Sequence, residues 1–267
     1  MITDEEFRRI VTFVKRRTGI ELQQKKVLII GRMENYLIKN GYANYNEYMN
    51  VVEKDITGKE IENLVNILTT NHTYFMREFE HMDFLKNRVL PELKKTKAES
   101  RDLRIWSAAS STGEEPYTIA MILNDFFGLD YLNWDTTILA TDISTQVLQY
   151  AAKGQYLKEQ IEPLPDTWKK RYFRVIAGDK FEVKPELKKA VLFRQFNLMN
   201  PLPFKRKLHV VFMRNVMIYF ERETKRELIQ RIYDFMEPGG YLFIGTTESI
   251  DKDCADFQYI CPSVYKK

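Results

Sequence analysis

The chain has little of what disulfide-bonded, zinc-binding and membrane-spanning proteins need. Its 267 residues include only two cysteines, Cys254 and Cys261, with no CxxC pair and no Cys/His cluster, which argues against a disulfide framework and a metal site. No apolar run approaches the ~18 residues of a transmembrane helix. The first residues, MITDEEF, are acidic where a secretory signal is basic and then apolar. We therefore expect no metal, no membrane insertion and a cytoplasmic location.

Two nucleotide-binding motifs are also missing. A GxGxxG with its usual spacing is absent, which counts against a dinucleotide, and so is GxxxxGK[ST], which counts against a P-loop. The content of 44% apolar and 29% charged residues is that of a soluble globular protein. The length allows one large domain, or one with a small accessory domain.

The central stretch, Leu103 to Thr118, predicts a strand, a tight loop and a helix in sequence. An apolar run, LRIW, precedes six small residues over 107–112, and Pro116 suits the first position of the helix that follows. Such a loop at a helix N-terminus exposes backbone donors, as in the nucleotide sites of open α/β sheets. An ordinary turn between a strand and a helix is the alternative.

The first 70 residues carry the spacing of four amphipathic helices. In three places a capping Thr or Asn is followed three residues later by Glu, ahead of an apolar series. These pairs are Thr3 with Glu6, Asn44 with Glu47, and Thr57 with Glu60. A further series ends at Asn40 and Gly41. The spacing predicts a small helical bundle that closes its own core.

Later segments alternate between strands and helices, which predicts an α/β fold with a parallel sheet covered on both faces. Strands are expected over 137–141, 191–196, 208–213 and 241–246, with an antiparallel edge hairpin over 257–265. A helix from 78 is expected to end at 90, before Pro91. Residues 155–190 predict short helical turns and a small hairpin near 181–183.

Polar residues close the predicted strands, where ligands collect in such sheets. They are the 107–115 loop with Glu115, Asp142, Asn197 with Leu198, and Arg214 with Asn215. Asp142 could accept both hydroxyls of a ribose, and Asn197 could contact an adenine edge. Each alone is weak, because Asp and Asn also end strands as turn formers. S-adenosylmethionine fits this set because its sulfonium needs no phosphate cradle.

Several of these segments together resemble the chemotaxis receptor methyltransferases, the CheR family. The segments are WSAASSTGEEPYTIA, ATDIS, NL at 197–198, RNVMIYF at 214–220 and NHTYFMRE at 71–78. The resemblance implies a Rossmann-like sheet typical of S-adenosylmethionine-dependent methyltransferases, preceded by a small all-α N-terminal domain. We divide the chain accordingly into a helical domain (1–70), a linker and helix that contribute to the cofactor pocket (71–100), and the methyltransferase domain (101–267).

The resemblance also implies an activity and a set of site residues. The activity is protein-glutamate O-methylation, which leaves S-adenosylhomocysteine. The cofactor would be held by Asn71, Thr73, Arg77, Glu115, Asp142, Asn197, Leu198, Arg214 and Asn215. Tyr219 matches a family tyrosine near the methyl group.

The chemistry explains why no catalytic triad or dyad is found. A glutamate side chain, with a pKa of about 4.3, is already ionised at neutral pH, so no general base is needed. The enzyme has only to hold oxygen, methyl carbon and sulfur in line, at about 3–3.5 Å. We therefore expect Arg77 and Tyr219 to position the reactants, and His72, His81 and His209 to be structural.

A surplus of basic residues over 8–39 suggests an acidic partner. Nine Lys and Arg residues stand against Glu21 and Glu34 there, and the methylation helices of chemoreceptors are rich in Glu, so this face is expected to dock the receptor. A solvated face without a partner is the alternative. Some family members bind a receptor's C-terminal peptide through an inserted β-subdomain. The matching stretch here, 175–187, is compact, so we expect no tight tether, and we expect a monomer.

Two other functions stay open on the sequence alone. A nucleic-acid methyltransferase agrees with the sequence pI near 8.8, although no [DNS]PP[YF] or Pro-Cys motif is present. A non-catalytic adaptor could keep the same fold, but the intact strand-closing residues speak against it.

Overall fold

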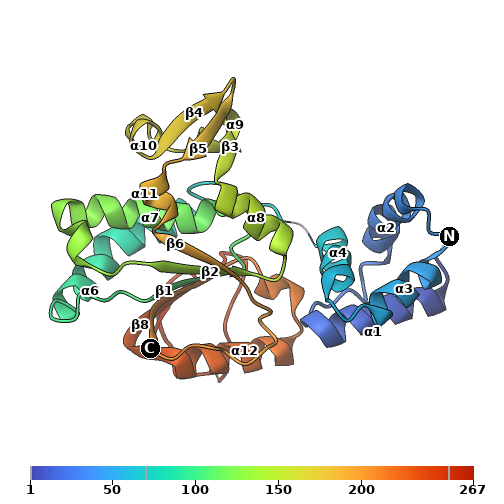
Figure 1. The fold of residues 1–267 in the computed structure, drawn as a ribbon. Coiled ribbons are helices and arrows are strands. Elements are labelled where there is room, and N and C mark those ends of the chain that lie inside the picture. Colours follow the sequence, from blue (N-terminus) through green and yellow to red (C-terminus); the bar gives the residue numbers. More distant parts are fainter. Residues whose placement is uncertain (1, 70, 252) are drawn as a thin grey trace.

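Four helices form the N-terminal part of the protein. The computed structural model describes residues 2–69, 71–251 and 253–267, so the expected boundary at residue 70 lies outside the described residues. The helices are α1 (Asp4–Thr18), α2 (Lys26–Asn40), α3 (Tyr45–Lys54) and α4 (Lys59–Leu68). Figure 1 shows them grouped at one end of the molecule, beside the sheet. Among the helices of the described residues, none combines the length and apolar character that a membrane span requires.

Capping explains where three of these helices begin, and it corrects one expectation. The hydroxyl of Thr3 accepts the N–H of Glu6 in a capping box, and Asn44 accepts the N–H of Glu47. The expected pair of Thr57 and Glu60 is wrong, because the carboxylate of Asp55 accepts the N–H of Glu60 instead, at 2.7 Å. A carboxylate is the stronger acceptor for free helix donors.

The helix after the linker continues past Pro91, contrary to expectation. It consists of α5 (Phe79–Phe84), a π-helical turn η1 (Leu85–Val89) and α6 (Leu90–Thr96). The N–H of Leu90 bonds to the carbonyl of Leu85, five residues back. The wider turn restarts the hydrogen-bond pattern, so Pro91 lies at the start of α6, where its missing N–H costs nothing.

A seven-stranded sheet forms the centre of the fold, in the order β6-β2-β1-β7-β8-β10-β9. The first five of these strands run parallel, and β10 and β9 add the antiparallel edge hairpin, as predicted. Their bounds are β1 (Ile105–Ala108), β2 (Ile138–Asp142), β6 (Val191–Gln195), β7 (Leu208–Met213), β8 (Met236–Ile244), β9 (Gln258–Cys261) and β10 (Val264–Lys266). Because β1 lies between β2 and β7, the order in which strands are added to the sheet reverses at β1, and ligands bind at such a point in open α/β sheets.

Helices cover both faces of this sheet (Figure 1). Helices α7 (Glu114–Phe127) and α8 (Thr145–Lys153) lie on one side, and α12 (Arg222–Phe235) lies on the other. Along β7, Val210 and Phe212 join the hydrophobic cluster that contains α7, whereas Val211 and Met213 join the cluster that contains α12. Helix α7 begins two residues before Pro116, so that proline is not at its first position. The 3-10 turns η2 (Gly128–Asn133) and η3 (Met217–Tyr219) complete the main body.

A second, three-stranded sheet projects from the main body (Figure 1). It has the order β3-β5-β4, which is more than the single small hairpin expected here. Its elements are β3 (Gln155–Leu157), α9 (Lys158–Ile161), α10 (Asp166–Tyr172), β4 (Phe173–Ala177), β5 (Lys180–Val183) and α11 (Pro185–Lys188). The hydroxyl of Tyr156 in β3 donates to the carbonyl of Thr112, at 2.7 Å, and so ties this sheet to the loop after β1.

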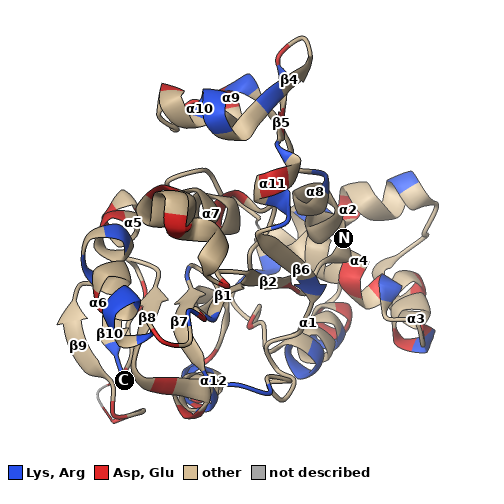
Figure 2. Ribbon diagram, turned by 60° about the vertical axis from the view of Figure 1, so that its left-hand side comes forward, with Lys and Arg blue, Asp and Glu red and all other residues tan. Residues whose placement is uncertain are grey.

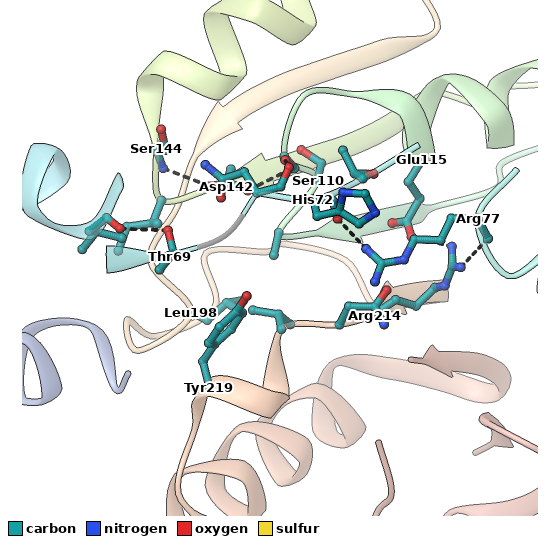
Figure 3. Close-up of a pocket in the computed structure, with 18 of the residues that line it drawn as sticks. Thr69, His72, Arg77, Ser110, Glu115, Asp142, Ser144, Leu198, Arg214 and Tyr219 are labelled. Atoms are coloured by element: carbon teal, nitrogen blue, oxygen red, sulfur yellow. Dashed lines mark hydrogen bonds and ion pairs between the residues drawn. The ribbon is translucent and has the colours of Figure 1, made fainter. Parts of the chain in front are cut away.

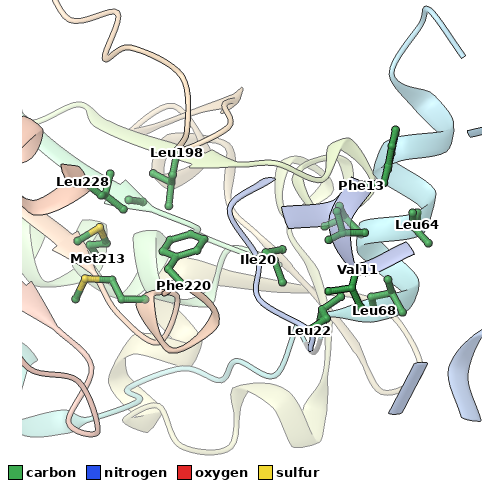
Figure 4. Packing of buried hydrophobic residues seen from close by; sticks show 14 of the residues in the cluster. Val11, Phe13, Ile20, Leu22, Leu64, Leu68, Leu198, Met213, Phe220 and Leu228 are labelled. Carbon is green, nitrogen blue, oxygen red and sulfur yellow. The ribbon is translucent and has the colours of Figure 1, made fainter. Parts of the chain in front are cut away.

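The helical part does not close its own core, contrary to expectation. Its buried residues belong to one hydrophobic cluster with β7, β8 and α12. Figure 4 shows Ile20 and Phe220 between the two groups of side chains, and these two residues form an antiparallel bridge. A bundle of about 70 residues is marginal alone, so the shared cluster stabilises both parts.

Candidate cofactor site

The carboxyl ends of β1, β2 and β7 open into a cavity of about 1090 Å³, a volume that includes its open mouth. All ten residues predicted for the site line this cavity. They are Asn71, Thr73, Arg77, Glu115, Asp142, Asn197, Leu198, Arg214, Asn215 and Tyr219. Figure 3 labels six of them around the cavity: Arg77, Glu115, Asp142, Leu198, Arg214 and Tyr219. The segments predicted from the sequence therefore meet around one cavity, although the sequence does not say what each side chain contacts.

The helical part supplies a wall of this cavity that the sequence did not predict. Thr18, Ile20, Val65, Asn66 and Thr69 line it together with the sheet residues. No motif marks these residues, because they lie on or just after helices α1 and α4, whose spacing predicts only a core. The cavity is thus closed by two parts of the chain that are far apart in sequence.

Asp142, at the end of β2, is 8% exposed and faces the cavity edge. One carboxylate oxygen accepts the N–H of Ser111 at 2.9 Å, and the other accepts the N–H of Ser144 at 3.0 Å. Burial raises the pKa of Asp142, and the two backbone donors oppose that shift. Each oxygen has a second lone pair, so the carboxylate can still accept hydroxyl donors of a ligand.

Asn197 lines the cavity, but its side chain already has protein partners. Its amide donates to the carbonyl of Arg17 at 2.8 Å, and its carbonyl oxygen accepts the N–H of Met199 at 2.9 Å. The Asn197 side chain therefore joins α1 to the loop after β6. Contact between this side chain and an adenine edge would have to use its remaining hydrogen-bonding capacity.

Arg214 forms an ion-pair cluster at the floor of the cavity, and it is 6% exposed. Its guanidinium contacts Glu115 at 2.8 Å and Glu78 at 3.1 Å, and it also donates to the backbone carbonyl of Arg77. Glu115 accepts a second hydrogen bond from Ser107, at 2.7 Å. Since two carboxylates surround one guanidinium, Arg214 is engaged by the protein, and the cluster has a surplus of negative charge.

The linker carries Arg77 along the cavity. The Arg77 guanidinium donates to the carbonyl of His72 at 2.6 Å and lies 5.9 Å from the centre of the Tyr74 ring. Ser111 reaches the carbonyl of Asn71 at 3.5 Å, which joins the linker to the loop after β1. No ion pair to Arg77 is formed within the described residues, so its charge can receive an anionic ligand.

Tyr219 enters the cavity from the side opposite Asp142 (Figure 3). It ends the η3 turn, and its carbonyl accepts the N–H of Glu21, at 2.8 Å. The helical part therefore holds the backbone of a residue that the resemblance places near the methyl group.

Two glutamates that the sequence did not single out hold the cavity floor. Glu78 contacts Arg214, Asn215 and Thr246. Glu248 accepts the backbone N–H groups of Gly245, Asn215 and Ile218 at 2.6, 2.9 and 3.1 Å. Glu78 belongs to the segment NHTYFMRE, which the resemblance had already marked as part of the pocket. Linear spacing, however, cannot reveal that its partner Arg214 lies 136 residues away.

The three histidines have different surroundings. His81 and His209 are buried, at 3% and 1% exposure, and they contact Glu78 and Arg104, in line with a structural role. His72 is exposed and lines the cavity, so its position differs from that of a structural core residue. Among the residues that the structure describes, no group of three His, Cys, Asp or Glu side chains could hold a metal ion.

Comparisons with known proteins agree with this architecture. Residues 71–265 match the family described as "CheR methyltransferase, SAM binding domain", and residues 5–69 match "CheR methyltransferase, all-alpha domain". Together the two matches span nearly all of the chain. S-adenosylmethionine is thus the cofactor of this fold.

Curated relatives match along most of their own length as well. A chemotaxis protein methyltransferase of Borreliella burgdorferi is 42% identical over 270 residues, which is 100% of this chain and 95% of that protein. A probable chemotaxis protein methyltransferase of Rhizobium etli is 35% identical, over 87% of this chain and 88% of that protein. The chemotaxis protein methyltransferase of Escherichia coli is 35% identical, over 93% and 85%. By domain models, identity and coverage alike, the chain belongs to the CheR family of S-adenosylmethionine-dependent chemotaxis protein methyltransferases.

Proposed function

We propose that this protein transfers the methyl group of S-adenosylmethionine to glutamate side chains of chemoreceptors, in the cytoplasm, and forms glutamate methyl esters. The observation that carries the proposal is a cofactor cavity in which Arg77 has no carboxylate partner among the described residues. A cation of this kind suits an acceptor that is itself an anion. The printed names of the relatives supply the chemotaxis context.

The residues present fit the cofactor. Asp142 offers carboxylate oxygens to the ribose hydroxyls, and apolar side chains such as Ile143 and Leu198 offer a surface to the adenine. The acidic cluster of Glu115, Glu78 and Arg214 suits the amino group of the methionyl part, because its carboxylates outnumber its guanidinium. Asn71, Thr73 and Asn215 add polar groups along the same wall.

The proposed mechanism uses positioning and no proton transfer. When bound, the cofactor supplies a methyl group activated by its sulfonium. Arg77 orients the incoming carboxylate from the linker side, and Tyr219 limits its approach from the opposite wall. Arg77 must hold the acceptor loosely, because tight ground-state binding of the anion would slow a reaction that neutralises it.

Receptor docking is assigned to the helical part, on a smaller basic surface than the sequence count suggests. At least three of the nine cations there pair with acids among the described residues: Arg9 with Glu53, Lys15 with Glu21 and Glu221, and Lys26 with Asp4. Arg16 and Arg17, in the last turn of α1, are exposed and form no ion pair within the described part of the chain. Figure 2 shows the mixture of charges on the helical part.

These two arginines also lie close to the chemistry. They precede Thr18, which lines the cavity, so an acidic receptor helix that contacts them reaches the cavity mouth. We propose that residues 1–70 dock the receptor, that 71–100 close the cofactor pocket, and that 101–267 bind the cofactor.

The deciding experiment is incubation with methyl-labelled S-adenosylmethionine and purified receptor cytoplasmic fragments, followed by mild alkali. Carboxyl methyl esters release volatile methanol, whereas N-methyl groups stay on the protein. A receptor fragment with its methylatable glutamates changed to alanine is the matched control. Label that resists alkali, or label found on added RNA or DNA, would replace this proposal by another methyltransferase activity. Binding of S-adenosylhomocysteine without any transfer would indicate an adaptor.

A further inference from the structure

Glu78 joins three segments that surround the cofactor cavity. Its side chain is 11% exposed, and its carboxylate lies 3.1 Å from the Arg214 guanidinium at the end of β7. It also accepts hydrogen bonds from Asn215 at 3.1 Å and from the backbone N–H of Thr246, after β8, at 3.2 Å. Nδ1 of His81 lies 3.1 Å away. One carboxylate at the end of the linker thus holds the linker to the ends of two central strands.

The electrostatics of this carboxylate show how firmly it is held. Burial by itself favours the neutral form, but the contact with His81 and the charge of Arg214 outweigh it and keep the pKa of Glu78 well below its ordinary value. Glu78 is therefore charged at every pH at which the enzyme is expected to work. A charged group with these partners is costly to move.

Glu78 and Arg77 are linked through Arg214 as well as through the chain. Arg214 binds the Glu78 carboxylate with two nitrogens, at 3.2 and 3.1 Å, and it donates to the backbone carbonyl of Arg77. The carbonyl of Arg77 is thus held on the sheet side while its guanidinium lies along the cavity. A shift of Glu78 would loosen the hold of Arg214 on that carbonyl, and it would leave the Arg77 side chain with its bond to the carbonyl of His72 as a restraint.

The backbone on both sides of Arg77 is in the left-handed region. Met76 has φ of 62° and Glu78 has φ of 53°, and neither residue is glycine. Such a conformation is unfavourable for residues other than glycine, and it persists where contacts elsewhere over-determine it. The contacts of the Glu78 carboxylate hold this turn from one side, and a 3.4 Å hydrogen bond from the N–H of Met76 to the hydroxyl of Thr118 holds it from the other.

We infer that Glu78 is a positioning residue for methyl transfer: through Arg214 and the strained turn it fixes Arg77 at the cavity. The effect on the rate of methyl transfer rests on the proposed function, whereas the effect on the conformation of the turn does not. The inference predicts that, with the cofactor saturating, the effect of Glu78 on kcat comes through Arg77, and that the turn opens when the Glu78 charge is lost.

The first test is a double-mutant cycle with Glu78→Gln and Arg77→Ala, which measures methyl transfer to receptor fragments. Because misplacement of about 1 Å can cost on the order of 100-fold in rate, we expect E78Q alone to lower kcat by about tenfold or more. In the R77A background, the same change should lower kcat by less than about threefold. Glu80→Gln is the matched control, since Glu80 is exposed in the first turn of α5, and it should leave kcat unchanged. If E78Q lowered kcat by the same factor in the R77A background as in the wild type, the inference would be overturned.

The second test needs no methyl transfer, so it separates this inference from the proposed function. Trypsin cleaves after Arg77, and the strained turn should protect that bond. We expect E78Q to speed cleavage after Arg77 at least about tenfold, after correction by matched synthetic peptides, while cleavage after the exposed Arg101 stays unchanged. Thr246→Val removes one hydroxyl donor to Glu78 and should speed the same cleavage to a smaller extent. This variant tests the inference even if E78Q folds poorly. Equal cleavage of all variants and wild type would refute a holding role.

Discussion

Asp142 and Ser111 are joined by a hydrogen bond of 2.9 Å, in which the backbone N–H after β1 donates to the carboxylate at the end of β2. The bond fixes two neighbouring strand ends relative to each other. It also leaves the carboxylate oriented by the protein before any ligand arrives, so little ordering is needed on binding.

Replacing Asp142 by alanine should therefore weaken cofactor binding strongly. The loss of charged hydrogen bonds to a ribose, at about 1.5–3 kcal/mol each, predicts a rise of at least about tenfold in the Kd for S-adenosylhomocysteine, measured by calorimetry. Asp179→Asn, at an exposed position of the projecting sheet, is the control. A Kd within twofold of wild type in D142A would rule out the ribose contact.

Charge reversal at Arg16 and Arg17 should separate docking from cofactor binding. The double variant R16E/R17E is expected to raise KM for receptor fragments severalfold at low salt, because it repels an acidic helix, and the difference should shrink as salt increases. The Kd for S-adenosylhomocysteine should not change. Lys94→Glu with Lys95→Glu, on α6, reverses as much charge away from the helical part and should leave KM unchanged. An equal rise in KM for the Arg16/Arg17 variant and the Lys94/Lys95 variant would argue against a specific docking face.

Two glycines should respond oppositely to alanine. Gly113 has φ of +96°, and a Cβ there would lie 2.8 Å from Cβ of Ala151, so G113A should lower the free energy of unfolding by about 1–3 kcal/mol. Gly31 lies inside α2 with open space around it, so G31A should raise the same quantity by about 0.5–1 kcal/mol. Urea unfolding measures both. A change of the same sign in the free energy of unfolding of G113A and G31A would contradict the argument from their backbone conformations.

His209 should make the protein sensitive to mild acid. Burial and the neighbouring charge of Arg104 lower its pKa to about 3, below its ordinary value of about 6.5. Between these pH values the unfolded chain takes up a proton that the folded chain does not, so stability falls as pH drops below about 6.5, by about 2 kcal/mol at pH 5.

The variant His209→Asn keeps an acceptor for the N–H of Arg104, which now bonds to Nδ1 at 3.0 Å. It should be less stable at pH 7.5 but should lose less stability between pH 7.5 and 5, as measured by urea unfolding. His72→Asn, at an exposed position, should keep the wild-type slope. If H209N lost as much stability between pH 7.5 and 5 as the wild type, other groups would be the cause of the acid sensitivity.

Much of the fold follows from local patterns in the sequence. The short apolar runs of β7 and β2, each followed by a polar residue, favour buried strands, and Thr3 and Asn44 cap their helices through contacts three residues away. The π-turn before Pro91 could not be predicted in the same way, because it depends on how the two halves of that helix pack.

The candidate site was predicted as a set of segments, and its internal contacts were not. Strand-closing residues such as Asp142 must meet at one sheet edge once the strands are parallel. The ion pairs of Arg214 depend instead on the three-dimensional approach of Glu78 from the linker. The basic count over 8–39 overstated the free charge, because the acids that pair with Arg9 and Lys15 lie outside that range, at Glu53 and Glu221.

The bridge between Ile20 and Phe220, with the neighbouring bond from Glu21 to the carbonyl of Tyr219, limits how receptor preference can be redesigned. Chimeras that exchange the first 70 residues with those of a homologue would put foreign side chains against Tyr219, the tyrosine that we propose positions the acceptor. A successful graft has to carry its opposing residues from the 3-10 turn and α12 with it, so new specificity is better sought on the outer surface of α1 and α2.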